Sequence, residues 1–513
     1  MRTTRRRSLL ALSAAAGLLA GGAAYAAPAA AAAATTTNGC LSSVPEKGTT
    51  EPVQICYSLF RPAGADATHR VPLVFHSHGW GGSRTTDPAA FASYLDDGYG
   101  VLSFDQRGFG ESGGKARVEN PAYEGRDVLA LVDLVSRLGW VQQDGPGDPH
   151  MAAIGGSYGG GYQFLGAFSA LTVKGKPLFD ALAPEITWFD LKQSLAPSEV
   201  VRTEWITALQ GIAANDEAPE LLSGVAYGLA TGTWPKGPAP VPDLDAFFLK
   251  NGPKWHVSQG RRLDIPVLFG QGITDNLFNL NQGLSNWDKA LTRSARARSI
   301  FVGYNGGHTL PSAVPAGYGV AGDPCSQQLA GGDFAALAKR FFDEALKGRR
   351  TGLTGYGRLH LATADGACVT RSSLATNASV ALGTVSAPTL AGPATVVPVA
   401  KGPLTISGIP RVTAKVTSVG LDNRSFLALA VGTTPQDAEV VQNNTLPLRL
   451  PKAVTGAARS IELPGIAVQV PKGSTLYLLA SPVADMYASH VGRTPGVITL
   501  ADTAVKLPQL VRP

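Results

Sequence analysis

Ser157, Asp275 and His308 have the residue types and the chain order that nucleophilic catalysis needs. Ser157 is the central residue of a G-x-S-x-G sequence at 155–159, with apolar residues before it and a glycine-rich segment after it. A strand, tight turn and helix in this order expose the serine at the carboxyl edge of a sheet. The flanking glycines leave room for the turn. The alternative is a plain glycine-rich loop with an incidental serine.

Asp275 and His308 supply the groups that Ser157 requires. A serine hydroxyl is a weak nucleophile near neutral pH, so it needs a base, and the base needs an acid to orient it. Asp275 follows a predicted strand at 265–269, and His308 follows one at 299–302. Taken singly, Asp275 could be a helix N-cap and His308 a surface histidine. Because both occur in the expected order after strands, we predict a Ser-Asp-His triad.

The backbone N–H groups of Tyr158 and Trp80 are the predicted oxyanion donors. Tyr158 directly follows the nucleophile, and Trp80 lies in a glycine-rich loop after a predicted strand at 72–78. Two such donors are needed to stabilise the charge that develops on the carbonyl oxygen. His76 and His78, at the end of that strand, are interpreted as residues that shape the loop.

The elements around these residues predict a mostly parallel sheet with helices on both faces. After a threonine-rich leader, apolar strands alternate with helical segments. The predicted strands are 53–60, 72–78, 99–105, 179–183, 265–269 and 299–302, and the helices include 123–138 and 334–346. Asp264 precedes its strand, which places it at the opposite edge, and it is excluded as the catalytic acid.

Two segments depart from this alternation. Residues 186–257 are rich in Trp, Leu and Ala, and we interpret them as a helical cap over the carboxyl edge; the alternative is ordinary crossover helices. From about residue 376 helical periodicity ends and short alternating strands follow, which predicts an all-β sandwich over 376–513. Its predicted strands are 411–417, 425–431, 465–470, 474–480 and 497–504, with 387–403 as a connection or first edge.

The N-terminus indicates export. Arginines at positions 5–7, an apolar alanine-rich stretch and a small-residue site near 24–26 predict a twin-arginine-like signal peptide at 1–26, although the general secretory route and a membrane anchor are alternatives. The chain has 44 Lys and Arg against 38 acids, and four of the arginines lie in this segment, so the remainder is nearly neutral. Nothing in this balance favours nucleic-acid binding.

Four cysteines remain for disulfides in an exported chain. They are Cys40, Cys56, Cys325 and Cys368, and three pairings are possible. We favour Cys40 with Cys56 and Cys325 with Cys368, because shorter loops close at a lower entropic cost. The sequence contains no C-x-x-C or H-E-x-x-H pattern, so we expect no metal site.

Together these motifs resemble the exported CocE/NonD-type serine hydrolases, which include Xaa-Pro dipeptidyl-peptidases and cocaine esterase. The matching pieces are H-G-W-G-G at 78–82, D-Q-R-G-F-G-E-S-G-G at 105–114, the elbow around Ser157, D-N-L-F at 275–278 and Gly307-His308. The resemblance implies an α/β-hydrolase with a helical cap and a C-terminal jelly-roll sandwich. It covers nearly all of the chain after the leader, with the catalytic domain at 40–375.

The resemblance also implies acyl transfer through an acyl-enzyme, without a cofactor, on an ester or on an amide after proline. Cocaine-esterase-like members place a tyrosine hydroxyl in the oxyanion loop, where this chain has Trp80. A dipeptidyl-peptidase further needs an acid for the amino terminus of the substrate. Glu185 and Asp190 are the candidates, with a solvated or capping acid as the alternative for each.

The predicted function is therefore a secreted serine hydrolase that cleaves a peptide or ester bond. A carboxylesterase without peptidase activity is one alternative. A non-catalytic glycan- or wall-binding protein on a hydrolase scaffold is another. The sequence leaves the natural substrate and the oligomeric state open.

Overall fold

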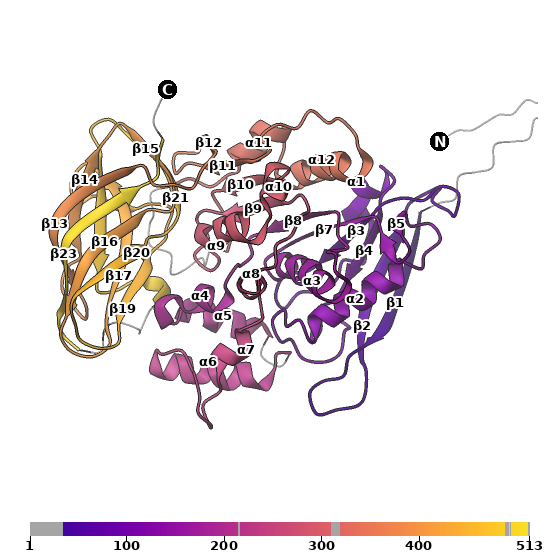
Figure 1. Ribbon diagram of the computed structural model, residues 1–513, viewed down its shortest axis with the longest axis horizontal. Helices are drawn as coiled ribbons and strands as arrows, with labels where there is room; N and C mark the ends of the chain where they lie inside the picture. The colour runs from indigo at the N-terminus through magenta and orange to yellow at the C-terminus, as the bar shows by residue number, and fades with distance from the viewer. Residues whose placement is uncertain (1–33, 214–215, 309–318, 488–491, 493, 511–513) are drawn as a thin grey trace, which may run out of the picture.

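The computed structural model describes residues 34–213, 216–308, 319–487, 492 and 494–510. They form an α/β region and an all-β region, which lie side by side in Figure 1. The predicted signal peptide lies outside the described residues. Within the described part of the chain, no helix combines the length and the apolar character that a membrane span requires.

A ten-stranded sheet organises the α/β region, in the order β1-β2-β4-β3-β7-β8-β9-β10-β11-β12. The pairs from β4 through β11 are parallel, while β1, β2 and β12 pair antiparallel with their neighbours. The strands are β1 (Thr35–Ser43), β2 (Val53–Arg61), β3 (Leu73–Ser77), β4 (Gly100–Phe104), β7 (Met151–Gly156), β8 (Ala181–Glu185), β9 (Leu268–Gly272), β10 (Ile300–Tyr304), β11 (Arg358–Ala362) and β12 (Cys368–Arg371). A small separate hairpin consists of β5 (Gln143–Gly145) and β6 (Asp148–Pro149).

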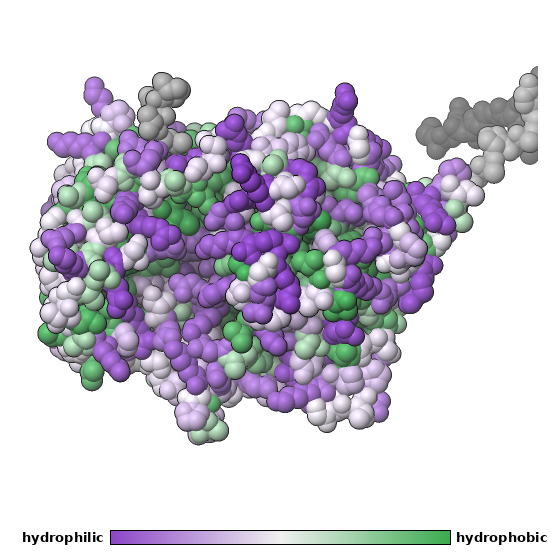
Figure 2. Space-filling model, viewed as in Figure 1, coloured by the Kyte–Doolittle hydropathy of each residue, from purple (hydrophilic) through white to green (hydrophobic). Residues whose placement is uncertain are grey.

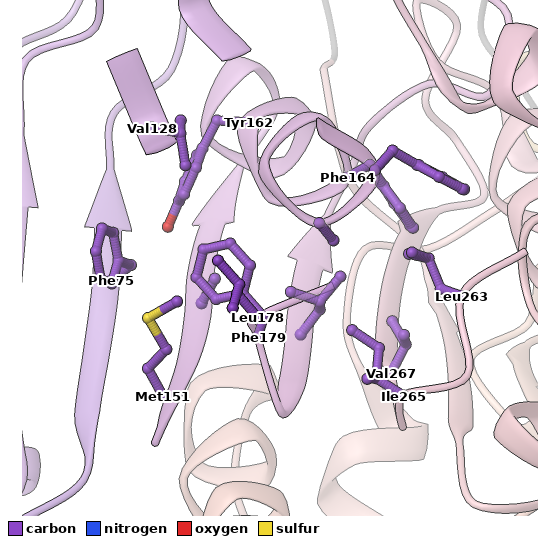
Figure 3. Close-up of a cluster of buried hydrophobic side chains, with 14 of the residues drawn as sticks. Phe75, Val128, Met151, Tyr162, Phe164, Leu178, Phe179, Leu263, Ile265 and Val267 are labelled. Atoms are coloured by element: carbon purple, nitrogen blue, oxygen red, sulfur yellow. The ribbon is translucent and has the colours of Figure 1, made fainter. Parts of the chain in front are cut away.

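Helices cover both faces of this sheet because the strand side chains alternate between two cores. Leu73 and Phe75 of β3 pack in one core with α2 and α3, whereas Val74 packs in the other with α1 and α12. Figure 3 shows part of the first core, in which Val128 and Tyr162 lie above Phe75, Met151 and Phe179. The helices of the two faces are α1 (Ala92–Leu95), α2 (Glu124–Val135), α3 (Tyr158–Lys174), α9 (Leu280–Ser285), α10 (Arg293–Ala297), α11 (Pro324–Ala330) and α12 (Phe334–Lys347).

Three details of the sheet differ from the sequence-based prediction. The threonine-rich segment before residue 53 is not a leader, because it forms β1 and pairs along the whole of β2. The strand predicted at 265–269 begins at Leu268, since Pro266 has no N–H for a ladder bond. After α12 the chain adds β11 and β12 to the sheet. These two strands were not predicted, because their sequences lack a strong alternation of apolar and polar residues.

Helices fill the segment that was interpreted as a cap. They are α4 (Leu191–Leu195), α5 (Thr203–Ala213), α6 (Pro219–Thr231), α7 (Leu244–Phe248) and α8 (Pro253–Ser258). In Figure 1, helices α4 and α5 lie below the sheet on the side of the all-β region, and α6 and α7 lie beneath them at the lower edge of the molecule. Their apolar side chains share a core with Tyr158 and Phe278 near the sheet edge and with Tyr487 of the all-β region.

The described part of the all-β region contains three sheets around one core of aliphatic side chains. Their orders are β13-β23-β16-β20, β14-β22-β17-β18 with β19 beside β17, and β21-β15-β24. The strands are β13 (Ala378–Pro388), β14 (Thr395–Lys401), β15 (Leu404–Gly408), β16 (Arg411–Ser418), β17 (Asn423–Gly432), β18 (Glu439–Val440), β19 (Leu446–Leu450), β20 (Val454–Glu462), β21 (Ile466–Val470), β22 (Thr475–Ser481), β23 (Val497–Leu507) and β24 (Gln509–Leu510).

Two disulfides join Cys40 to Cys56 and Cys325 to Cys368. The first lies across the β1–β2 pair, where the two cysteines face each other in register. The second ties α11 to β12. Outside these cores, hydrophilic residues are spread over the visible face of the molecule, with smaller apolar patches between them, as Figure 2 shows.

Candidate active site

Ser157 occupies a strained turn between β7 and α3. Its backbone has φ 58° and ψ −119°, a conformation that non-glycine residues rarely adopt. The turn requires glycine on both sides. A Cβ atom added to Gly155 would lie 2.5 Å from the carbonyl oxygen of Gly159, and one added to Gly159 would lie 2.4 Å from that of Ser77. The sequence therefore folds here into the strand–turn–helix of a nucleophile elbow.

Asp275 and His308 come together from two different loops. Nδ1 of His308 lies 2.7 Å from Oδ2 of Asp275. The other oxygen of Asp275, Oδ1, accepts hydrogen bonds from the backbone N–H groups of Leu277 and Phe278 at 2.9 and 3.0 Å. Because a carboxylate only accepts, Nδ1 carries the imidazole proton and Nε2 is left with a lone pair. His308 is thus in the tautomer that a general base requires.

An apolar cavity opens beside Ser157. Ser157 and Tyr158 line it together with side chains from the cap and with Leu277 and Phe278 of the loop after Asp275. The ring of Phe278 contacts that of His308, with the centroids 5.2 Å apart. Nε2 of His308 is buried and has no hydrogen-bond partner among the described residues. The side chain of Ser157 makes no capping hydrogen bond to α3.

The loop after β3 passes directly against Ser157. A Cβ atom added to Gly79 would lie 3.9 Å from the Cβ of Ser157. His78 holds the loop, because its Nδ1 donates to the carbonyl of Gly79 at 2.8 Å while its Nε2 accepts from the backbone N–H of Gln106 at 3.0 Å. Trp80, which follows Gly79 in the same loop, lines the cavity. Its ring packs on that of Tyr158 with a centroid distance of 5.1 Å.

Residues 105–114 pack against this loop and hold it in place. Asp105 is fully buried and accepts from the backbone N–H of Glu111 at 3.0 Å and from the Arg84 side chain. Phe109 packs edge to face against the Trp80 ring at 4.9 Å. Arg107 is also fully buried, and its guanidinium pairs with Asp127 at 2.7 Å. This motif therefore acts structurally, by fixing the loop that carries Trp80.

One acid in the cavity was missed by sequence reasoning. Of the described residues that line the cavity, Glu217 alone carries a carboxyl group. Its Oε1 is buried without a hydrogen-bond partner among the described residues. Burial raises the pKa of Glu217 to about 7, and a hydrogen bond with Gln210 opposes that rise. Nothing in the local sequence marks this glutamate, which precedes α6 in the cap.

The two acids that were considered for a substrate amino terminus do not line this cavity. Asp190 caps α4, since it accepts from the backbone N–H of Gln193 at 3.3 Å, and it pairs with Lys254. Glu185 lies at the end of β8, where its side chain faces a separate hollow beside α12. Burial raises the pKa of Glu185 to about 7. Asp190 is thus the capping acid that the sequence allowed as an alternative, and Glu185 lies at a different hollow from the one beside Ser157.

Solved structures with this architecture include several hydrolases. A CocE/NonD family hydrolase from Staphylococcus aureus is 11% identical with a TM-score of 0.61, over 94% of this chain and 98% of that one. An aminopeptidase from a marine sediment Thaumarchaeota archaeon is 13% identical with a TM-score of 0.63, over 93% and 96% of the two chains. An α-amino acid ester hydrolase is 13% identical with a TM-score of 0.59, over 95% and 99%. At these identities the likeness establishes the shared fold.

Sequence comparison identifies the family. A curated Escherichia coli protein, an uncharacterized 31.7 kDa protein of the traX-finO intergenic region, is 30% identical over 104 residues, or 20% of this chain and 35% of that protein. The chain thus spans about a third of the length of this relative. The family described as X-Pro dipeptidyl-peptidase (S15 family) matches residues 51–309, half of the chain. The chain therefore belongs to the X-Pro dipeptidyl-peptidase family S15, and it is a hydrolase.

Proposed function

We propose that Ser157 is the nucleophile, His308 the general base and Asp275 the acid that orients it. Ser157 Oγ attacks the substrate carbonyl carbon and its proton passes to Nε2 of His308. The same proton then goes to the leaving amine or alcohol, and the acyl group stays on Oγ. Water, deprotonated by His308, hydrolyses this acyl-enzyme and restores the serine. The strained turn at Ser157 and the 2.7 Å Asp275–His308 contact support these roles, as does the contact of the His308 ring with Phe278, which lines the cavity beside Ser157.

The oxyanion of each tetrahedral intermediate would be held by two backbone N–H groups. Tyr158 is the first residue of α3, so its N–H has no intrahelical acceptor. Trp80 lies in the loop that contacts Ser157, and the described residues include no acceptor for its N–H. Each donor of this kind is commonly worth about 3 to 4 kcal/mol of barrier. Backbone donors of this kind require no tyrosine hydroxyl in the loop.

The substrate class that we propose is a peptide with a free amino terminus, cleaved as by a dipeptidyl-peptidase. The observation that carries this is the position of Glu217 in a cavity otherwise lined mainly by apolar groups, next to the nucleophile. A buried carboxyl with one oxygen, Oε1, that has no hydrogen-bond partner among the described residues would be stabilised by a cationic partner. A substrate ammonium group would supply that charge, while the apolar walls, including Trp188, Trp234 and Phe248, would hold the side chains.

An esterase remains the second candidate, because the same apolar walls fit the acyl group of an ester. In that case Glu217 would have no charged partner on the substrate. The two candidates therefore differ in one property, the need for a free amino group. The family assignment leaves no role for the non-catalytic alternative.

Export is part of the proposal. The signal-like segment at 1–26 and the two disulfides are compatible with an oxidising compartment outside the cytoplasm. Processing near residue 26, found by mass spectrometry of the secreted protein, would support it. An intact N-terminus on cytoplasmic protein would contradict it.

Two chromogenic substrates test the proposed function on the purified enzyme and on Ser157→Ala. One is an Ala-Pro p-nitroanilide, with its amino terminus either free or acetylated, and the other is a short-chain p-nitrophenyl ester. We expect the free anilide to be cleaved, the acetylated one to be a poor substrate, and Ser157→Ala to be inactive but folded. Ester cleavage without anilide cleavage would favour the esterase. Turnover by Ser157→Ala would refute the triad.

A further inference from the structure

The loop that carries Asp275 is held by a side chain from the all-β region. Nδ2 of Asn444 lies 3.0 Å from the carbonyl oxygen of Ile273 and 3.2 Å from that of Asp275. It also lies 3.3 Å from the carbonyl oxygen of Gln442. All three neighbours are acceptors, so the amide group must present its N–H₂ side to them. Asn444 is only 1% exposed, so solvent has little access to the carbonyl groups that its side chain holds.

The loop depends on such outside donors. It follows β9 without continuing any ladder, so its carbonyl groups need partners from other parts of the chain. The Arg202 side chain, from the start of the cap, donates to the carbonyl of Asn276. The indole N–H of Trp205 donates to Oδ1 of Asn276 at 2.7 Å, and its ring contacts that of His308 at 5.7 Å. The helical cap and the all-β region therefore both form hydrogen bonds to the loop that carries Asp275.

The backbone that presents Asn444 is unusual. Gln442 and Asn443, the two residues before it, have φ values of 49° and 58°. Consecutive non-glycine residues in this left-handed region carry a conformational cost that the surrounding structure must offset. Gln442 anchors the turn, because its side chain bonds to Asn305 at 2.7 Å and to the backbone N–H of Ala467 at 2.8 Å. The turn between β18 and β19 is therefore fixed against the α/β region.

We propose that Asn444 is a positioning residue for the catalytic acid. It acts through Asp275: by fixing the two carbonyl groups of the loop, it fixes the direction from which Oδ2 meets Nδ1 of His308. This inference rests on the proposed triad and extends it across the interface between the two regions. It also gives the all-β region a part in catalysis that does not require it to touch the substrate.

The test replaces Asn444 by leucine, which keeps about the same size and removes the donor. The matched control is Asn281→Leu, because Asn281 is also buried and bridges the same two regions, through Leu463 at 3.1 Å and Gly465 at 2.7 Å, without contacting the loop of Asp275. Both full-length variants are compared with wild type for kcat, KM, the pH profile of kcat/KM and labelling by a fluorophosphonate probe.

We expect Asn444→Leu to lower kcat by about tenfold to a hundredfold with little change in KM, since small misplacements of catalytic groups have effects of this size. The acidic limb of its kcat/KM profile should move to lower pH, because a poorly aimed carboxylate stabilises the protonated imidazole less. Asn281→Leu should lose thermal stability but keep the wild-type kcat and profile. Equal effects of the two variants on kcat and profile would overturn the inference.

A second variant keeps the test decisive if Asn444→Leu fails to fold. Asn444→Asp has nearly the same shape, and its carboxyl can donate only when protonated. Its activity relative to wild type should therefore rise as the pH falls. A ratio near one that does not vary with pH would refute the inference. Turnover by Ser157→Ala would overturn the proposed function together with this inference, whereas wild-type-like Asn444 variants beside an inactive Ser157→Ala would overturn the inference alone.

Discussion

Nδ1 of His308 lies 2.7 Å from Oδ2 of Asp275, although the two residues follow different strands of the sheet. The acid is fully buried, and its second oxygen is occupied by the backbone N–H groups of Leu277 and Phe278. These two bonds determine which oxygen faces the imidazole. The carboxylate can therefore fix the tautomer of His308 and, in the proposed mechanism, stabilise the imidazolium that would form during proton transfer.

Asp275→Asn should lower kcat by about 10⁴-fold without unfolding the protein. The asparagine Oδ1 can still accept from Leu277 and Phe278, which retains the turn. Its amide N–H₂ would then face Nδ1 of His308 and favour the tautomer with the proton on Nε2. Steady-state kinetics and circular dichroism measure the two effects. Asp264→Asn is the control, because Asp264 is exposed and should not affect kcat; equal losses in both variants would refute the assignment.

Trp80→Phe should lower kcat about threefold to tenfold. The indole N–H of Trp80 donates to the carbonyl of Leu209 in α5 at 3.1 Å and so ties the loop after β3 to the cap. Phenylalanine keeps the ring contacts with Phe109 and Tyr158 but loses this bond, and one neutral hydrogen bond is worth about 1 kcal/mol. Trp140→Phe, in the core away from the cavity, should leave kcat unchanged. A wild-type kcat for Trp80→Phe would show that the tie has no catalytic effect.

KM for a substrate with a free amino group should rise as the pH falls from about 8 to 6. Burial raises the pKa of Glu217 to about 7, so its carboxyl becomes neutral over this range and loses its attraction for the ammonium group. Below the pKa each pH unit should raise KM by up to about tenfold. KM for a p-nitrophenyl ester should not follow this trend.

Two variants control the Glu217 prediction. In Glu217→Gln, KM for the free-amine substrate should be high at every pH and should no longer vary between pH 6 and 8. Asp190→Asn, which changes the N-terminal capping residue of α4, should keep the wild-type dependence of KM on pH. Should Glu217→Gln keep that profile as well, Glu217 would have no role in amine binding.

Arg107→Met should lower the free energy of unfolding by about 3 to 5 kcal/mol. Arg107 is fully buried and bonds to Asp127 at 2.7 and 2.8 Å and to Glu46 at 3.0 Å. Burial raises the pKa of Asp127 even with Arg107 beside it, so without the guanidinium its charged form would be strongly destabilised. The control is Arg296→Met, which breaks a partly exposed ion pair with Asp288. Urea denaturation should show that this variant loses less than about 1 kcal/mol of unfolding free energy. Similar losses in the two variants would contradict this account.

The sequence determined the parts of the site that depend on local geometry. The tight turn at Ser157 depends on the glycines beside it. Asp275 and His308 each follow a strand that can be predicted from a run of apolar residues. Parallel strands bring their carboxyl ends to one edge, so the order of elements along the chain predicts that the three residues gather there. The structure shows the contact between Asp275 and His308. The same local signals explain why most sheet strands and α12 were predicted close to their observed bounds.

Only the tertiary structure decided which other side chains reach that edge. Asn444 meets Asp275 across 169 residues of sequence. Glu217 enters the cavity from the cap, and no local sequence pattern predicts how the cap helices pack over the sheet. The same holds for Glu185 and Asp190, whose sequence positions suggested the cavity but whose side chains point elsewhere. Local periodicity fixes the face of an element on which a residue lies; the packing of one element against another fixes what that residue touches.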